Sequence, residues 1–259
     1  PGSMKVQFFS IAGNQHAFLG FPSPVSAPLA DLFDATNCYF HLTKYGLGMT
    51  KLIGQQLPTD FSMPTITNFP KLLNAFFSPD DFELGTGPGF MLFGDLKEDT
   101  GVTADDYCRD PTVMCHEYTH AIASFIGLGF STPPPDAPNR AINEAIADYF
   151  AASFFKDPRI GFPLAQIASP AFVTANSMTS DGLRNLAAPK TFFDNLMDDS
   201  SGGIPEEHAA GHIFGCTLWH VREIAKQKFT DDLVFDSIFN WPQSLTELGY
   251  TEYTPDNAV

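Results

Sequence analysis

The stretch CHEYTHAI (Cys115–Ile122) carries two histidines four residues apart, with a glutamate directly after the first. It lies in the apolar segment Val113–Ile126, which follows Pro111 and precedes two glycines. Proline is well tolerated in the first turn of a helix and glycine commonly ends one, so this segment predicts a helix. Residues i and i+4 share a helix face, which lets His116 and His120 direct a ring nitrogen at the same ion.

The residue types in this stretch suit zinc hydrolysis. Zinc binds histidine nitrogen, and a catalytic zinc site uses three protein ligands and leaves one position for water. Glu117 is rotated about 100° from His116 on the helix, so it can reach the attacking water as a general base without binding the metal. Two structural histidines on an apolar helix are the alternative, and the rest of the chain has to decide between them.

A third ligand is expected from the next helix, which helical spacing of apolar residues predicts over Asn139–Phe155. Glu144 offers a carboxylate there, and Asp148 lies one turn further along the same face. Asp148 could hold the outer nitrogen of a ligand histidine, as carboxylates around zinc sites do. Burying two carboxylates unpaired is costly, and a metal ion with its histidines would remove that cost. The alternative is that both face water.

The remaining segments divide by character. Residues 5–100 are rich in Phe, Gly, Pro and Thr, which predicts short strands and turns, with a helix around Ala27–Tyr45 and a strand at Phe90–Phe93. Further helices are expected over Glu206–Lys226 and Thr230–Phe239. The sequence therefore predicts an α+β protein of two lobes. Residues 5–127 would form a strand-rich lobe that ends in the zinc helix, and residues 128–259 a helical lobe.

Charge and cysteine content narrow the possible partners. Fourteen basic and thirty acidic residues give a net charge of −16, which argues against nucleic acid and anionic membrane as partners. No apolar run approaches the roughly 18 residues of a membrane span. The four cysteines allow three pairings, and their spacing selects none. Cys115 is interpreted as a reduced core residue, and the absence of a C-x-x-C pair excludes a zinc ribbon.

HEYTH followed by NEAIAD resembles the thermolysin-like (gluzincin) zinc metallopeptidases. The resemblance extends to NAFF (Asn74–Phe77), FMLFGD (Phe90–Asp95) and LRNL (Leu183–Leu186). It implies a thermolysin-like zincin fold with zinc on the two histidines and Glu144. It also implies roles in substrate binding. Asn74 and Ala75 would bind the substrate backbone, and Arg184 would bind a substrate carbonyl. Val113 and Leu183 would line an apolar pocket on the leaving-group side of the scissile bond.

His208, at the start of the helix over Glu206–Lys226, resembles the family histidine that donates a hydrogen bond to the oxyanion. A neighbouring carboxylate should orient it, and the sequence does not choose among Asp199, Glu206 and Glu207. There is a rival interpretation, because four potential ligands recur at every fourth position of this helix and could form a second metal stripe: His208, His212, Cys216 and His220.

The resemblance also has gaps. The family uses a tyrosine between the second zinc histidine and the zinc glutamate, and residues 121–143 contain none. Thr112 and Phe155 stand where the family has calcium-binding carboxylates, so no calcium is expected at that site.

Together these features predict a zinc endopeptidase with peptide or protein substrates, and the resemblance implies cleavage before an apolar residue. The alternatives are a non-catalytic, zinc-containing peptide-binding protein on the same fold, or a zinc hydrolase of a non-peptide amide or ester. The resemblance implies a secreted or periplasmic location, and a monomer is expected.

Overall fold

The computed structural model describes residues 5–12, 15–19, 29–53, 62–79, 89–95, 106–125, 137–188 and 207–237. The chain divides into two compact units, the first comprising Pro1–Ala121 and Arg159–Arg184, the second Ile122–Pro158 and Asn185–Val259. The first unit thus includes a segment from later in the chain. The boundary expected near residue 127 and the two-lobed arrangement stay predictions.

A five-stranded mixed sheet forms the frame of the first unit, in the order β2-β1-β3-β5-β4. The parallel pairs are β1 with β3 and β3 with β5, whereas β2 pairs with β1 and β4 with β5 in antiparallel fashion. This order leaves β4 as an edge strand. The strands span Lys5–Ala12 (β1), Gln15–Leu19 (β2), Ser62–Pro70 (β3), Ala75–Ser78 (β4) and Phe90–Asp95 (β5).

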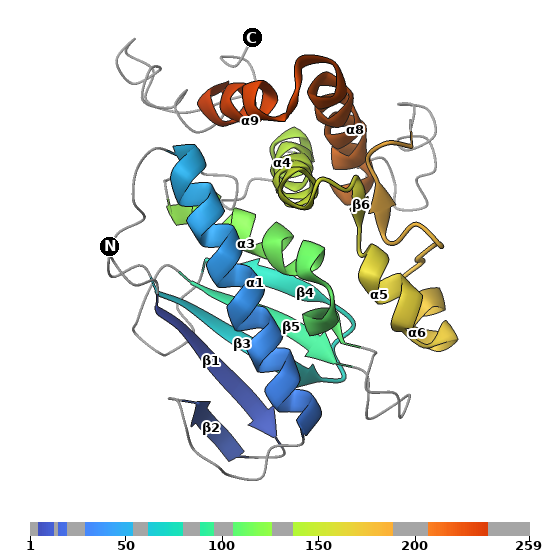
Figure 1. Cartoon of the computed structure of the whole chain (residues 1–259). Coiled ribbons are helices and arrows are strands. Elements are labelled where there is room, and N and C mark those ends of the chain that lie inside the picture. The colour runs from blue at the N-terminus through green and yellow to red at the C-terminus, as the bar shows by residue number, and fades with distance from the viewer. Residues whose placement is uncertain are drawn as a thin grey trace. The chain divides into compact units, whose positions relative to one another are not determined.

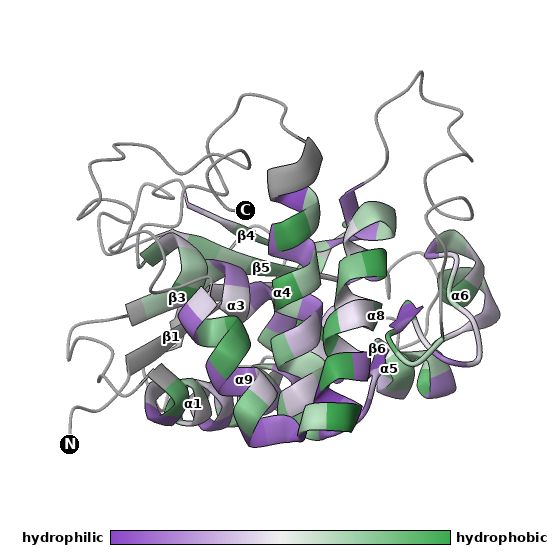
Figure 2. Ribbon diagram, turned by 90° about the horizontal axis from the view of Figure 1, so that it is seen from above, coloured by the Kyte–Doolittle hydropathy of each residue, from purple (hydrophilic) through white to green (hydrophobic). Residues whose placement is uncertain are grey.

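Apolar side chains on the inner strands form the core of this sheet. All six residues of β5 are buried, and Figure 2 shows this strand mostly in the green of apolar residues. Ile66, Phe90 and Leu92 make one buried cluster. The strand expected at Phe90–Phe93 is confirmed and continues to Asp95.

Helix α1, Leu29–Ile53, lies along one face of the sheet (Figure 1) and contacts β1 and β3. Its inward side chains Cys38, Leu42 and Tyr45 are fully buried. The sequence predicts this helix only to Tyr45. It continues through two glycines, which weaken a helix by about 1 kcal/mol each, because Met49 beyond them is buried in the core.

The zinc-helix candidate is α3, Pro111–Phe125, and a short 3-10 turn, η1, Tyr107–Arg109, leads into it. The later segment of the first unit, Arg159–Arg184, contains short elements that were not predicted from the sequence. These are β6 (Arg159–Ile160), α5 (Phe162–Ile167), α6 (Pro170–Ala175) and β7 (Arg184–Asn185), the last at the edge of the unit.

The second unit is helical where the structure describes it, with α4 (Ala137–Phe155), α8 (Glu207–Ala225) and α9 (Gln227–Phe235). Helix α8 packs along α4, and Asp231 of α9 accepts hydrogen bonds from Tyr149 and Ser153 of α4, both at 2.7 Å. Lys226 takes a positive φ of 76° and separates α8 from α9. The expected end of α9 at Phe239 lies outside the described residues.

The arrangement is a mostly helical α/β mixture with small sheets, as an α+β protein should be. Within the described ranges, no helix combines the length and the apolar character needed to cross a bilayer.

Candidate metal centre

Asp110 anchors the start of α3. One carboxylate oxygen accepts hydrogen bonds from the backbone N–H groups of Thr112 (2.8 Å) and Val113 (3.3 Å), and the other from Leu164 N of α5 (3.0 Å). Asp110 is fully buried, and burial raises the pKa of its carboxyl, while these hydrogen bonds oppose the rise. This cap was not predicted from the sequence, although an aspartate directly before a helix-starting proline is a recognisable signal.

Thr112 has a structural role at the same turn. Its hydroxyl donates to the Asp110 carboxylate (2.5 Å) and accepts from Gly161 N (2.8 Å). The absence of calcium at this position stays a prediction.

On α3, His116 and His120 bring their Nε2 atoms to 3.1 Å from each other, with ring planes at 90°. His116 is 4% exposed. Two nitrogens bound to one zinc ion at about 2.0–2.1 Å and a tetrahedral angle lie about 3.3–3.4 Å apart. The two histidines therefore already hold their nitrogens at close to the separation that a shared zinc ion requires.

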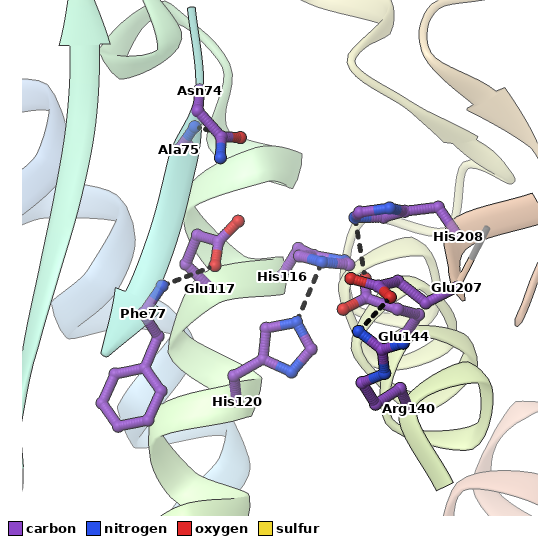
Figure 3. A network of polar contacts seen from close by, with 10 residues as sticks. All are labelled: Asn74, Ala75, Phe77, His116, Glu117, His120, Arg140, Glu144, Glu207 and His208. Carbon is purple, nitrogen blue, oxygen red and sulfur yellow. Dashed lines mark hydrogen bonds and ion pairs between the residues drawn. The ribbon is translucent and has the colours of Figure 1, made fainter. Parts of the chain in front are cut away.

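Glu117 faces the sheet rather than the two histidines' ring nitrogens. Its Oε2 accepts a hydrogen bond from Phe77 N of β4 at 2.9 Å (Figure 3), and the residue is 6% exposed. This contact holds one carboxylate oxygen against the edge strand. The carboxylate is thus positioned next to the turn that carries His116 and His120 by a residue 40 positions away in the sequence.

Along the outer edge of β4, side-chain oxygens accept from the backbone N–H groups of Ala75 and Phe77. In an antiparallel pair, alternate residues direct their N–H and C=O groups to the same side. Asn74 O bonds to Gly94 N, so Ala75 and Phe77 face away from β5. The Asn74 side chain accepts from Ala75 N at 2.9 Å. Asn74 and Ala75 therefore lie on the exposed edge where the resemblance predicts substrate binding.

In the second unit, His208 and Glu144 are paired. His208 Nε2 lies 3.2 Å from Glu144 Oε2, and the side chains are 42% and 14% exposed (Figure 3). Arg140 binds Glu207 at 2.7 Å between the same two helices. Of the three carboxylates left open as partners for His208, Glu207 is engaged by Arg140, and Asp199 and Glu206 lie outside the described residues.

A close approach of α8 to α4 places His208. A Cβ atom added at Gly211 would lie 2.6 Å from Ala141 O and 2.9 Å from Glu144 Cβ, so only glycine fits there without a shift. The missing side chain lets the first turn of α8 rest on the turn of α4 that carries Glu144. No short sequence pattern marks Gly211 for this role.

Among the residues that the structure describes, His116, His120 and Glu144 form a group that could hold a metal ion, each offering one ligand atom. The donor set, two imidazoles and one carboxylate, suits zinc. The roles of the remaining predicted residues stay predictions. Asp148 and Val113 are buried, and Leu183 and Arg184 are half-buried beside β6, where Leu183 N donates to Ile160 O at 2.8 Å.

The rival metal stripe on α8 has different partners for each member. His212 Nε2 lies 3.0 Å from Asn185 O, and Cys216 Sγ donates to Ala188 O at 3.3 Å. His220 Nδ1 lies 2.8 Å from Cys216 O in its own helix. These contacts favour packing and capping roles for the three residues that follow His208.

The chain resembles a solved metalloproteinase in fold. The precursor of protealysin, a metalloproteinase from Serratia proteamaculans, superposes with a TM-score of 0.61 at 14% sequence identity, covering 92% of this chain and 75% of that one. No protein-family model matches the sequence, and no curated protein matches it. At this identity the similarity shows the fold alone.

Proposed function

We propose that this protein is a zinc-dependent endopeptidase of the thermolysin-like (gluzincin) type that cleaves peptide bonds before an apolar residue. The observation that carries the proposal is the 3.1 Å approach of the His116 and His120 Nε2 atoms on a helix that also presents Glu117. Two imidazoles with converging nitrogens and an adjacent carboxylate are the parts that water activation by zinc requires. The metalloproteinase fold neighbour supports the same conclusion.

His116, His120 and Glu144 would hold the zinc ion. Bound there, zinc would supply Lewis-acid polarisation of the scissile carbonyl and a lowered pKa for the attacking water. Glu117, with one oxygen fixed by Phe77 N, would take the water's proton on its other oxygen and pass it to the leaving amine.

His208 would donate a hydrogen bond to the developing oxyanion, a contact typically worth about 2.7–4 kcal/mol of transition-state stabilisation. In this structure its Nε2 pairs with Glu144 Oε2 at 3.2 Å, which brings the ring to the residue proposed as the third zinc ligand. An extended substrate would add to the outer edge of β4 through the backbone of Ala75 and the side chain of Asn74. Arg184 would clamp a substrate carbonyl, Val113 and Leu183 would line the apolar pocket, and Asp148 would orient a zinc histidine.

The test is the Glu117→Ala variant. We expect it to keep one zinc per chain by elemental analysis and to lose at least about two orders of magnitude in peptide turnover, because a general base contributes about 10²–10⁴-fold. Glu223→Ala is the matched control, since Glu223 lies on the exposed side of α8 and its Oε1 accepts from Trp219 Nε1 of the same helix. It should keep both zinc and rate.

Unchanged turnover in Glu117→Ala would contradict the mechanism. A zinc-loaded wild-type chain that binds peptides but cleaves none across a broad library would instead identify a peptide-binding protein, which the missing family tyrosine favours. Turnover of small amides or esters alone would identify a non-peptide hydrolase.

A further inference from the structure

Two cysteines distant in sequence meet in the first unit. The Cys38 thiol in α1 lies beside the Cys108 thiol in η1. Both are fully buried, and neither is bonded to another cysteine in this structure. Their spacing in the sequence does not indicate a pair, so the proximity is a product of the tertiary fold.

Two further contacts hold these elements together beside the thiols. Asn37 Nδ2, adjacent to Cys38, donates to Cys108 O at 2.8 Å. Arg109 Nε, adjacent to Cys108, lies 2.5 Å from Asp34 Oδ1, one helical turn before Cys38. The two sulfur atoms are therefore kept near each other by anchors that do not depend on the thiols themselves.

We propose that Cys38 and Cys108 form an oxidisable dithiol, which closes into a disulfide linking α1 to the turn that leads into the zinc-helix candidate α3. The co-reactant is a small-molecule disulfide such as oxidised glutathione. One cysteine thiolate attacks it to give a mixed disulfide, and the second displaces the remaining glutathione. One S–S bond forms in the protein, one is reduced, and the two cysteine protons leave with two glutathione thiols.

Burial of the two thiols limits when thiol–disulfide exchange can occur. It raises the pKa of both thiols, and the thiolate is the attacking species, so the closed native core exchanges slowly. The link therefore forms before the core closes, or when α1 opens locally. An oxidising compartment, where disulfides persist, would populate it.

Differential alkylation of the wild-type chain tests the proposal. The protein is incubated with oxidised glutathione in buffer and in mild denaturant that permits local opening, then acid-quenched, unfolded, treated with N-ethylmaleimide and analysed by mass spectrometry. We expect four alkylated thiols to fall to two, with one cross-linked peptide pair containing Cys38 and Cys108. The thermal midpoint should rise by roughly 5–15 °C, because the link closes a loop of about 70 residues.

Cys108→Ser and Cys38→Ser should each lose the cross-link and the oxidant-dependent rise. Cys216→Ser, whose Sγ contacts Ala188 O in the second unit, should keep both. Four thiols still alkylated after both incubations, or a cross-link between any other pair, would overturn the proposal. Because the peptide map is made on the wild-type chain, the result does not depend on a variant folding, and it stands apart from the peptidase activity.

Discussion

The pKa of the buried Asp106 carboxyl depends on the charged residues around it. Asp106 is 1% exposed and accepts from Cys108 N at 2.6 Å. Burial first, and then the charge of Asp34, raise its pKa well above the ordinary value, and Asp95 adds to the rise. Arg109 pairs with Asp34 in the same cluster. Ionised Asp106 is therefore a destabilising group at neutral pH.

This residue predicts a pH-dependent stability. A carboxyl whose folded-state pKa is raised stabilises the fold below its unfolded pKa, and that contribution is lost as pH rises through the folded pKa. Asp106→Asn keeps the oxygen that accepts from Cys108 N and cannot ionise. The variant should therefore be more stable than wild type at pH 7, by about 1.4 kcal/mol for each unit of raised pKa, with the difference shrinking toward pH 4.

Urea unfolding between pH 4 and pH 8 measures this difference. Asp232→Asn, which removes the exposed partner of Lys228, is the control and should change little. A lower stability of Asp106→Asn that is constant across this range would contradict the raised pKa of Asp106.

At the scale of elements, the contact of α8 with α4 determines where His208 lies. Gly211→Ala would bring a Cβ within 2.6 Å of a backbone oxygen of α4, which cannot move without shifting the helix. We expect a loss of about 1–3 kcal/mol of stability, as overpacking costs, together with weaker zinc binding because Glu144 lies under the same contact.

Gly215→Ala is the matched control. Its added Cβ meets the flexible end of Leu186 at 2.9 Å, and alanine is about 1 kcal/mol better than glycine in a helix, so the net change should be near zero. Urea unfolding and competition with a zinc chelator would measure both quantities. Equal effects of the two variants would rule out a special role for Gly211 in placing Glu144 and His208.

At the scale of the whole molecule, the proposed ligand set draws two residues from α3 and one from α4. A ligand that binds only the folded state raises its stability by RT ln(1 + [L]/Kd). We therefore expect a chelator to lower the thermal midpoint of the wild-type chain and added zinc to restore it.

Variants separate this effect from a general one. His116→Ala should show the low midpoint without chelator and no response to zinc, whereas His220→Ala, whose ring bonds to its own helix, should behave like wild type. If His116→Ala still responded to the chelator, the metal would bind somewhere other than α3.

The sequence by itself determined what depends on local spacing. The helical period places His116 and His120 on one face, proline and glycine mark the ends of α3, and apolar periodicity predicts the helix that carries Glu144. These relations hold within a few turns of backbone, so they can be deduced from residue order alone. The same reasoning placed the strand at Phe90 and the helix that begins near His208.

Only the tertiary structure decided which distant groups meet. It brought Phe77 N to Glu117, Gly211 onto the Glu144 turn, and the Cys38 thiol to Cys108, and it returned Arg159–Arg184 to the first unit. Each of these contacts joins residues tens of positions apart. Such pairings result from packing the whole chain, where many weak local preferences are overridden by the burial of apolar surface, and no short pattern of residues encodes them.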